Sequence, residues 1–182
     1  MSLLWAVLGL VALERGAELL FAGANTRRLR RLGASEADAA GYPLFVVLHA
    51  GWLASLALLV PPATPPSWPL LGLFALLQAG RLWVIASLGR RWTVRVLVLP
   101  DTPPLRIGPY RWLRHPNYLI VAGEIALLPL AFAAPGIALG FSAANLVLIA
   151  RRIRIEEAAL APGRHGSCEL SHSGRPAPRR PV

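Results

Sequence analysis

The segment WPLLGLFALLQAGRLWVIASL, residues 68–88, decides the fold class of this chain. A helix rises about 1.5 Å per residue, so a segment of this length crosses the hydrocarbon core of a bilayer, which is about 30 Å thick. Its one charged side chain is Arg81, and a charge at that depth is costly unless it faces other helices and is paired there. The segment therefore predicts a membrane helix inside a bundle.

Further apolar runs lie on both sides of this segment. Those at residues 2–24 and 42–60 are long enough to cross a bilayer, whereas those at 118–134 and 136–150 are short and are expected to form a tight hairpin. The composition agrees with a membrane domain, because the 182 residues are 55% apolar and only 15% charged. We therefore expect an all-α fold in residues 1–160, a polytopic membrane helical bundle of about five transmembrane helices.

The first apolar run has a competing interpretation as a signal peptide, because Ala22-Gly23-Ala24 resembles a cleavage site. However, no positive residue precedes the run, and Glu14, Arg15 and Glu18 interrupt it. We interpret it as the first membrane helix.

The net charge of +10 comes wholly from arginine, since the chain contains no lysine. The arginines gather at residues 26–31, 90–114 and 150–154, whereas the connections at 61–67 and 133–136 carry none. Under the positive-inside rule the basic segments face the cytoplasm, which places the N-terminus outside and the C-terminus inside. Basic groups between apolar runs suit anionic headgroups, so the expected partners are membrane lipids and not nucleic acid.

Residues 161–182 are rich in proline, glycine, serine and arginine and contain no aromatic residue, which predicts a disordered tail. His165, Cys168 and His172 lie in this tail, but three ligands in a flexible segment do not make a zinc site, so no metal is expected. Cys168 is the only cysteine, which excludes an internal disulfide.

Polar side chains inside the apolar runs share helical faces. Glu14 and Glu18 lie four residues apart, and Gln78 and Arg81 lie three apart, so we expect each set to point into the bundle and to pair structurally. His49, in VVLHAGW, is either a core histidine or a substrate contact.

The stretch GPYRWLRHPNYLIVAGE, residues 108–124, is unusually polar for the start of an apolar run. Pro116 suits the first turn of a helix, where its missing N–H costs nothing. Arg114 and His115 would then lie at the helix N-terminus, where free backbone N–H groups favour an anionic ligand. The proline-rich segment before them is expected to form a structured loop at the cytoplasmic interface.

GPYRWLRHPNYL resembles the signature Gly-Pro-Tyr-x-x-x-Arg-His-Pro-x-Tyr of the integral-membrane methyltransferases, which include isoprenylcysteine carboxyl methyltransferase and the phospholipid N-methyltransferases. RRIRIEEAAL is similar to the double glutamate that completes this signature. The N-terminal half resembles a bacterial branch that methylates hydroxyl groups of alkylpyrones and related polyketide lipids. The chain departs from the pattern at Ile120, where relatives usually carry a small residue, and in the segment after the double glutamate.

The resemblance implies S-adenosylmethionine as the cofactor, bound at a cytoplasmic loop and at the C-terminal segment. It assigns cofactor binding to residues of the two motifs and to nearby arginines: Gly108, Tyr110, Arg114, His115, Pro116, Tyr118, Arg151, Glu156 and Glu157. The two glutamates would hold the ribose hydroxyls or the α-ammonium group. Arg114 or Arg151 would take the cofactor carboxylate.

The implied acceptor is a lipophilic small molecule, either an alkylpyrone or alkylresorcinol that is methylated on oxygen, or a prenylcysteine-like carboxylate. Glu124 or His49 would be the base that removes a hydroxyl proton. The resemblance further implies a multi-pass protein of a bacterial-type cytoplasmic membrane, with its cofactor site facing the cytoplasm.

Two other functions stay open. Membrane reductases of the sterol type use NADPH and carry an Asn-Tyr pair followed by a glutamate, which Asn117, Tyr118 and Glu124 echo at a longer spacing. A non-enzymatic lipid-binding protein is the other alternative. Binding of adenosylmethionine, of NADPH or of neither would separate the three.

Overall fold

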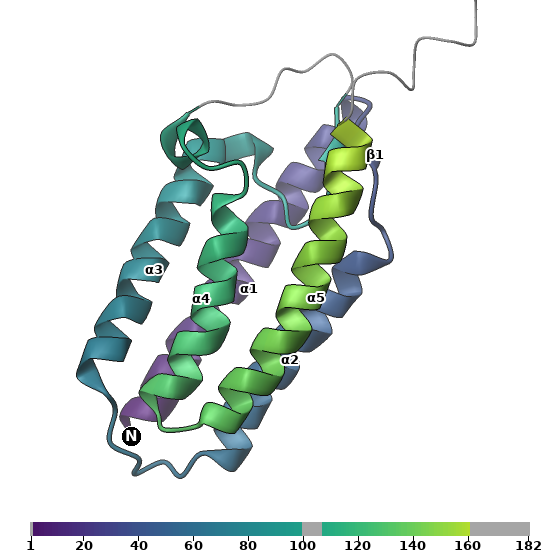
Figure 1. Cartoon of the computed structure of the whole chain (residues 1–182). Coiled ribbons are helices and arrows are strands. Elements are labelled where there is room, and N and C mark those ends of the chain that lie inside the picture. Colours follow the sequence, from purple (N-terminus) through teal and green to yellow (C-terminus); the bar gives the residue numbers. More distant parts are fainter. Residues whose placement is uncertain (1, 100–106, 161–182) are drawn as a thin grey trace, which may run out of the picture.

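The computed structural model describes residues 2–99 and 107–160, and this part of the chain is built almost wholly from helices (Figure 1). In chain order the elements are α1 (Leu3–Arg31), β1 (Ser35–Glu36), α2 (Gly41–Leu59), α3 (Trp68–Leu88), the 3-10 helix η1 (Gly89–Arg91), β2 (Leu97–Val98), the 3-10 helix η2 (Gly108–Arg111), α4 (Pro116–Ala131) and α5 (Pro135–Leu160). The α-helices run up and down in one bundle, which confirms the predicted helical membrane fold.

Three helices in the described residues are long and apolar enough to cross a membrane: Gly41–Leu59, Trp68–Arg91 and Pro135–Ala159. α4 is apolar but shorter, and α1 is long but carries two glutamates and an arginine in its middle. The expectation that the last apolar run makes a short helix was wrong. The sequence RRIRIEE follows that run, and because its arginines and glutamates are good helix formers, α5 continues through them.

The predicted hairpin between the last two runs is confirmed. α4 begins at Pro116, with His115 as its N-cap residue, as the sequence predicts. The chain leaves α4 through Ala133, whose φ of 54° lies in the left-handed region, and Pro135 opens α5. The backbone N–H of Ser67 donates to the carbonyl oxygen of Ala131 at 2.8 Å, which fastens the α2–α3 connection to this hairpin.

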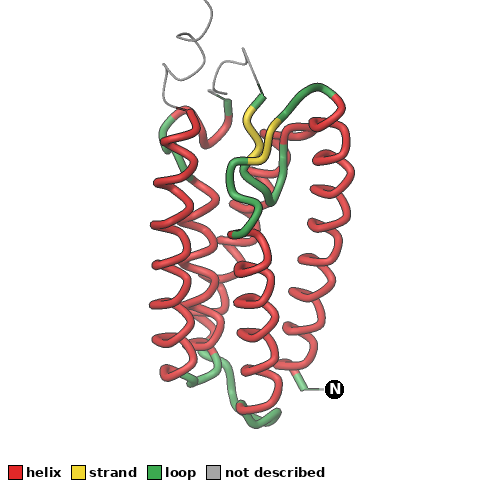
Figure 2. The backbone as a smooth tube through the Cα atoms, turned by 90° about the vertical axis from the view of Figure 1, so that its right-hand side faces the viewer, coloured by secondary structure: helices red, strands yellow, loops and turns green. Residues whose placement is uncertain are grey.

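The two ends of the bundle differ in their arginine content. The connection from α2 to α3 and the α4–α5 hairpin lie at the end where α1 begins, and both lack arginine. The opposite end holds the arginine-rich segments and the two-stranded ladder, in which Ser35 pairs with Val98 and Glu36 with Leu97 (Figure 2). There Glu36 accepts from Arg95 at 2.7 Å and also pairs with Arg30, so the ladder ties the end of α1 to the segment after α3.

The interior of the bundle is apolar and so is much of its outer surface. Leu4, Trp52, Leu56, Ile125 and Leu128 are among the residues of the buried cluster that α1, α2 and α4 share with α5. Large aliphatic side chains also cover the outside, including Leu20, Leu58 and Leu139. An apolar exterior of this extent suits contact with lipid tails rather than water.

A cluster of charged groups crosses the bundle interior between α1, α3 and α4. The Arg81 guanidinium donates to both oxygens of Glu18 at 2.5 and 2.7 Å and to Glu124 at 3.1 Å. Arg15 donates to Glu18 at 3.0 Å, to Glu124 at 3.2 Å and to the Gln78 side-chain oxygen at 3.1 Å. This confirms the prediction that Glu18, Gln78 and Arg81 point inward and pair, whereas Glu14 is only half-buried and lies 3.7 Å from Arg15. The cluster also includes Glu124 and joins three helices.

Candidate functional site

The candidate site forms where the first turn of α4 meets the last turns of α5. The Tyr118 hydroxyl donates to Glu156 Oε2 at 2.6 Å. The His115 ring stacks on the Tyr118 ring, with 5.3 Å between centroids and 20° between planes, and its Nδ1 lies 3.8 Å from Glu156 Oε2. The two sequence motifs, far apart in the chain, therefore contribute to one cluster, as the resemblance implies.

The outer edge of this cluster is charged and open to solvent. Glu157 Oε1 lies 3.9 Å from His115 Nε2 and 3.7 Å from an Arg114 guanidinium nitrogen. The Arg114 side chain is 85% exposed, whereas that of His115 is 21% exposed. The cluster thus runs from a half-buried histidine to a solvated arginine, which suits a polar ligand that enters from the aqueous side.

Gly108 sets the backbone path into η2. Its φ is 53°, and a Cβ added there would lie 2.1 Å from Ser87 Oγ, so both conformation and space require glycine. Tyr110, in the same turn, is half-buried; burial, together with the neighbouring Glu156 carboxylate, raises the pKa of its hydroxyl to about 12. Tyr110 is therefore a neutral hydroxyl group at physiological pH.

A hollow of about 470 Å³ opens beside this turn. Its lining residues are Tyr110, Arg111, Trp112, Leu113 and Arg114. The lining contains two guanidinium groups and two aromatic rings, which are the kinds of group that contact anionic and amphiphilic molecules in other proteins.

Three buried polar atoms at the cluster have no hydrogen-bond partner within residues 2–99 and 107–160. They are His115 Nε2, Asn117 Oδ1 and Arg152 Nε. Buried polar atoms are nearly always paired, because leaving one unpaired costs about 1–3 kcal/mol. The unused hydrogen-bonding capacity of these atoms therefore indicates that a polar ligand binds at this cluster.

Arg152 belongs to the site, although the sequence reasoning chose its neighbour Arg151. Its side chain is buried, donates to the carbonyl oxygen of Val94 at 2.6 Å, and places its guanidinium 5.1 Å from the Phe45 ring centroid and 5.9 Å from that of Tyr118. The signal was present in the sequence, because Arg152 precedes Glu156 by four residues and so shares its helical face.

Arg151 faces a different partner. Its guanidinium donates to both oxygens of Asp38 at 3.0 and 3.1 Å, and Asp38 also accepts from the backbone N–H of Gly41 at 3.0 Å. This pair anchors α5 to the start of α2. Asp38 was not recognised as important from the sequence, because an acidic residue in a short polar connection carries no distinctive pattern.

The structure does not bring the two predicted bases into the cluster. Glu124 lies in the buried charged cluster, with one oxygen bound to Arg15 and the other to Arg81. His49 lies on α2, where its Nδ1 donates to the Phe45 carbonyl oxygen at 2.8 Å and its ring meets that of Trp52 edge to face. Their roles as bases stay predictions.

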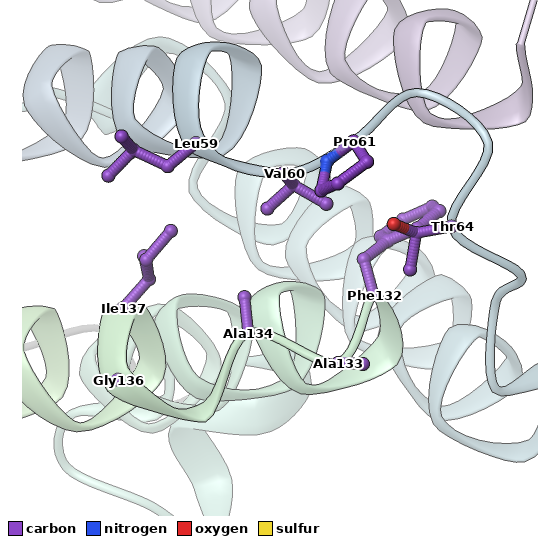
Figure 3. Close-up of a pocket in the computed structure, with 9 residues that line it drawn as sticks. All are labelled: Leu59, Val60, Pro61, Thr64, Phe132, Ala133, Ala134, Gly136 and Ile137. Atoms are coloured by element: carbon purple, nitrogen blue, oxygen red, sulfur yellow. The ribbon is translucent and has the colours of Figure 1, made fainter.

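A second hollow, of about 320 Å³, lies at the opposite end of the bundle, between the α2–α3 connection and the α4–α5 hairpin (Figure 3). Its lining is Leu59, Val60, Pro61, Thr64, Phe132, Ala133, Ala134, Gly136 and Ile137. The Thr64 hydroxyl is the one polar side-chain group in this lining, so the hollow offers no chemistry of its own.

Within the described part of the chain, no three side chains of histidine, cysteine, aspartate or glutamate gather as a metal site. His165, Cys168 and His172, like the whole predicted tail, lie outside the described residues.

Comparisons with known proteins agree with the two motifs. The isoprenylcysteine carboxyl methyltransferase family matches residues 70–162, a range that includes η2, α4 and α5. The uncharacterized protein YpbQ of Bacillus subtilis (strain 168) is 35% identical over 161 residues, which cover 86% of this chain and 95% of that protein. No solved structure matches the chain. The matched range and the paired motifs together show that this membrane protein belongs to the isoprenylcysteine carboxyl methyltransferase family.

Proposed function

We propose that this protein transfers a methyl group from S-adenosylmethionine to a lipophilic acceptor at the arginine-rich end of the bundle. The observation that carries the proposal is the Tyr118–Glu156 hydrogen bond, which joins two motifs 38 residues apart in the sequence. His115 and Glu157 complete the same cluster. Family membership supports methyl transfer in general, and this cluster supports the identity of the cofactor.

The side chains present fit this cofactor. Glu156 and Glu157 offer carboxylates for the α-ammonium group or the ribose hydroxyls, and Arg114 offers a cation for the α-carboxylate. The unpaired atoms of His115 and Asn117 supply further polar contacts. The Tyr118 ring suits a sulfonium cation through cation–π attraction. When bound, the cofactor supplies an electrophilic methyl group, and the work of these residues is to position it.

We further propose that the acceptor is a long-tailed hydroxypyrone or alkylresorcinol that is methylated on oxygen. Its tail would enter sideways between helices, because both the interior and the exterior of the bundle are apolar. Each methylene that leaves water contributes about 0.8 kcal/mol, so affinity should rise with tail length. A prenylcysteine carboxylate is the second candidate acceptor, and the family name of the matching group favours it.

The arginine-rich end would face the cytoplasm, where adenosylmethionine is available. The three arginine-rich segments lie at one end of the bundle, and the positive-inside rule places such an end on the cytoplasmic side. The protein would then be a multi-pass protein of a bacterial-type cytoplasmic membrane.

Calorimetry on detergent-purified protein tests the cofactor assignment. His115→Ala and Glu156→Ala should each weaken adenosylmethionine binding by about 1–3 kcal/mol, because each removes a polar partner from a charged ligand in a half-buried site. Arg90→Ala is the control, since it removes an exposed arginine at the same end of the bundle but outside the cluster. Wild-type affinity in both cluster variants would contradict the assignment, and binding of NADPH instead would favour the reductase alternative.

Transfer of labelled methyl groups tests the acceptor. The matched set is a long-tailed and a short-tailed alkylpyrone, farnesylcysteine and phosphatidylethanolamine. We expect product mainly from the long-tailed pyrone. Product from farnesylcysteine or the phospholipid, with none from the pyrone, would overturn O-methylation while leaving adenosylmethionine as the cofactor.

A further inference from the structure

The buried face of α5 carries polar side chains that lie closer to the N-terminus of this helix than the cofactor cluster does. Ser142, Asn145, Arg152 and Glu156 follow one another at spacings of three, seven and four residues, so they lie on one face of the helix. Asn145 is 0% exposed, and neither its Oδ1 nor its Nδ2 has a hydrogen-bond partner among the described residues. Ser142 Oγ is likewise buried without a partner in that part of the chain.

Two more polar groups, on α2, lie at about the same position along the bundle axis as Ser142. A Cβ on Gly51 would lie 3.6 Å from Phe141 Cε1, which places Trp52 within about one helical turn of Ser142. Trp52 is 2% exposed, and its Nε1–H has no partner in the described residues. His49, one turn along α2, donates through Nδ1, so its Nε2 is left as an acceptor.

An unpaired amide at this depth is unfavourable, because the bilayer core has no water to satisfy it. A leucine of similar volume would fill the same space without this cost. The polar groups offer both donors and acceptors, and the amide, hydroxyl and indole are uncharged. The chemistry that fits them is a neutral oxygen function that both accepts and donates, such as a ring hydroxyl.

We propose that Asn145, assisted by Ser142 and Trp52, binds a second oxygen of the acceptor, one that is not methylated. The inference rests on the proposed function and narrows its substrate class to lipids whose ring carries at least two oxygen functions. Asn145 precedes Glu156 by eleven residues, which is about 16 Å along the helix axis. The oxygen bound by Asn145 therefore lies on the membrane side of the one that receives the methyl group.

A matched pair of lipids and a matched pair of variants test this proposal. The lipids are a long-tailed alkylresorcinol, with two ring hydroxyls, and an alkylphenol with the same tail and one hydroxyl. The variants are Asn145→Leu, which removes the amide, and Ala144→Leu, which adds the same side chain on the exposed side of α5. Binding is measured by calorimetry in detergent, and methyl transfer is measured in parallel.

The wild-type protein and Ala144→Leu should bind the resorcinol about tenfold more tightly than the phenol, which is the effect of one well-formed hydrogen bond. Asn145→Leu should reduce this ratio to about threefold or less, with adenosylmethionine affinity unchanged. An unchanged ratio in Asn145→Leu, or no preference in the wild-type protein, would overturn the proposal. A preference that Asn145→Leu abolishes, but without any methyl transfer, would instead overturn the proposed function and leave Asn145 as a lipid-binding residue.

Thermal unfolding separates this role from a structural one. Without lipid, Asn145→Leu should unfold at the wild-type temperature or above it, because an unpaired polar group is replaced by an apolar one of similar size. The resorcinol should raise the unfolding temperature of the wild-type protein more than that of Asn145→Leu. Should Asn145→Leu fail to fold, Ser142→Ala provides the test, with a smaller loss of preference expected and an unchanged preference counting against the proposal.

Discussion

Tyr118 and Glu156 are joined by a hydrogen bond of 2.6 Å between the first turn of α4 and the last turns of α5. This contact fixes where the Glu156 carboxylate points, because one of its oxygens is held by the phenol. The other oxygen makes no hydrogen bond with a side chain in the described parts of the chain, so it can bind a ligand. The pair therefore positions a ligand group as well as joining two helices.

Replacing Tyr118 with phenylalanine should weaken adenosylmethionine binding by about 0.5–1.5 kcal/mol, because the hydroxyl is lost but the ring is kept. Tyr118→Leu should weaken it further, since the aromatic face is lost too. Calorimetry on the two purified variants measures both effects. Equal affinities in the two variants would show that the ring does not contact the cofactor.

Gly108→Ala should destabilise the loop before α4 and lower cofactor affinity. A Cβ at this position meets Ser87 Oγ at 2.1 Å and Ser87 Cβ at 2.9 Å, and the backbone φ of 53° disfavours alanine independently. The double variant Gly108→Ala with Ser87→Ala should recover part of the loss, because only the hydroxyl contact is relieved. Full recovery in thermal unfolding would mean that backbone conformation contributes little.

Tyr110 predicts how stability changes at alkaline pH. Because burial raises the pKa of this hydroxyl from 10.0 to about 12, the folded protein retains a proton that the unfolded chain releases. Its contribution to stability is complete below pH 10 and is lost as the pH rises from about 10 through 12. Unfolding followed in detergent from pH 8 to 12 should therefore show a steeper decline for the wild-type protein than for Tyr110→Phe. Parallel curves would contradict this assignment.

Arg81→Met should be strongly destabilising, by about 3–5 kcal/mol, because it leaves Glu18 and Glu124 close together without this cation. The triple variant Glu18→Gln, Arg81→Met and Glu124→Gln should be closer to the wild-type protein, since of these side chains only Arg15 then keeps its charge, and its guanidinium lies 3.7 Å from the Glu14 carboxylate. Unfolding temperature in detergent and the amount of protein in the membrane measure the effect. A triple variant that is less stable than Arg81→Met alone would argue against pairing as the cause.

Reporter fusions test the orientation in the membrane. A reporter fused at Pro65, in the arginine-free connection, should report the outside, and one fused at Arg95, beside the ladder, should report the cytoplasm. The α2–α3 connection, which contains Pro65, and the ladder, which Arg95 precedes, are at opposite ends of the bundle (Figure 1), so the same result at both positions would contradict the topology.

Helices and their inward-facing charges could be predicted from the sequence because both follow from local spacing. The start of α4 at Pro116 is one example, and the burial of Glu18 and Arg81 inside the bundle is another. The length of α5 was missed because hydropathy falls at Arg151 while helix propensity does not. Hydropathy indicates which residues lie in lipid. It therefore gives no signal for the part of a helix that extends past the membrane.

The candidate site was partly predictable for a similar reason. His115, Tyr118 and Glu156 belong to recognisable motifs, and the structure brings them together. The pairing of Arg151 with Asp38 depends on how the β1–α2 connection folds back, which no local pattern encodes. The unpaired Asn145 amide could not be recognised from the sequence either, because whether a polar group has a hydrogen-bond partner depends on the residues that surround it in the folded protein.

The buried charged cluster also constrains how the protein is made. α1 leaves the ribosome first, yet two of its charged groups, Arg15 and Glu18, find partners on α3 and α4, which are synthesised later. Until then α1 is a poor membrane segment, because its charges are too costly to leave in lipid without those partners. We therefore expect α1 to stay at the insertion machinery or at the membrane surface until α4 is complete. A chain truncated before α4 should be retained there or degraded rather than inserted.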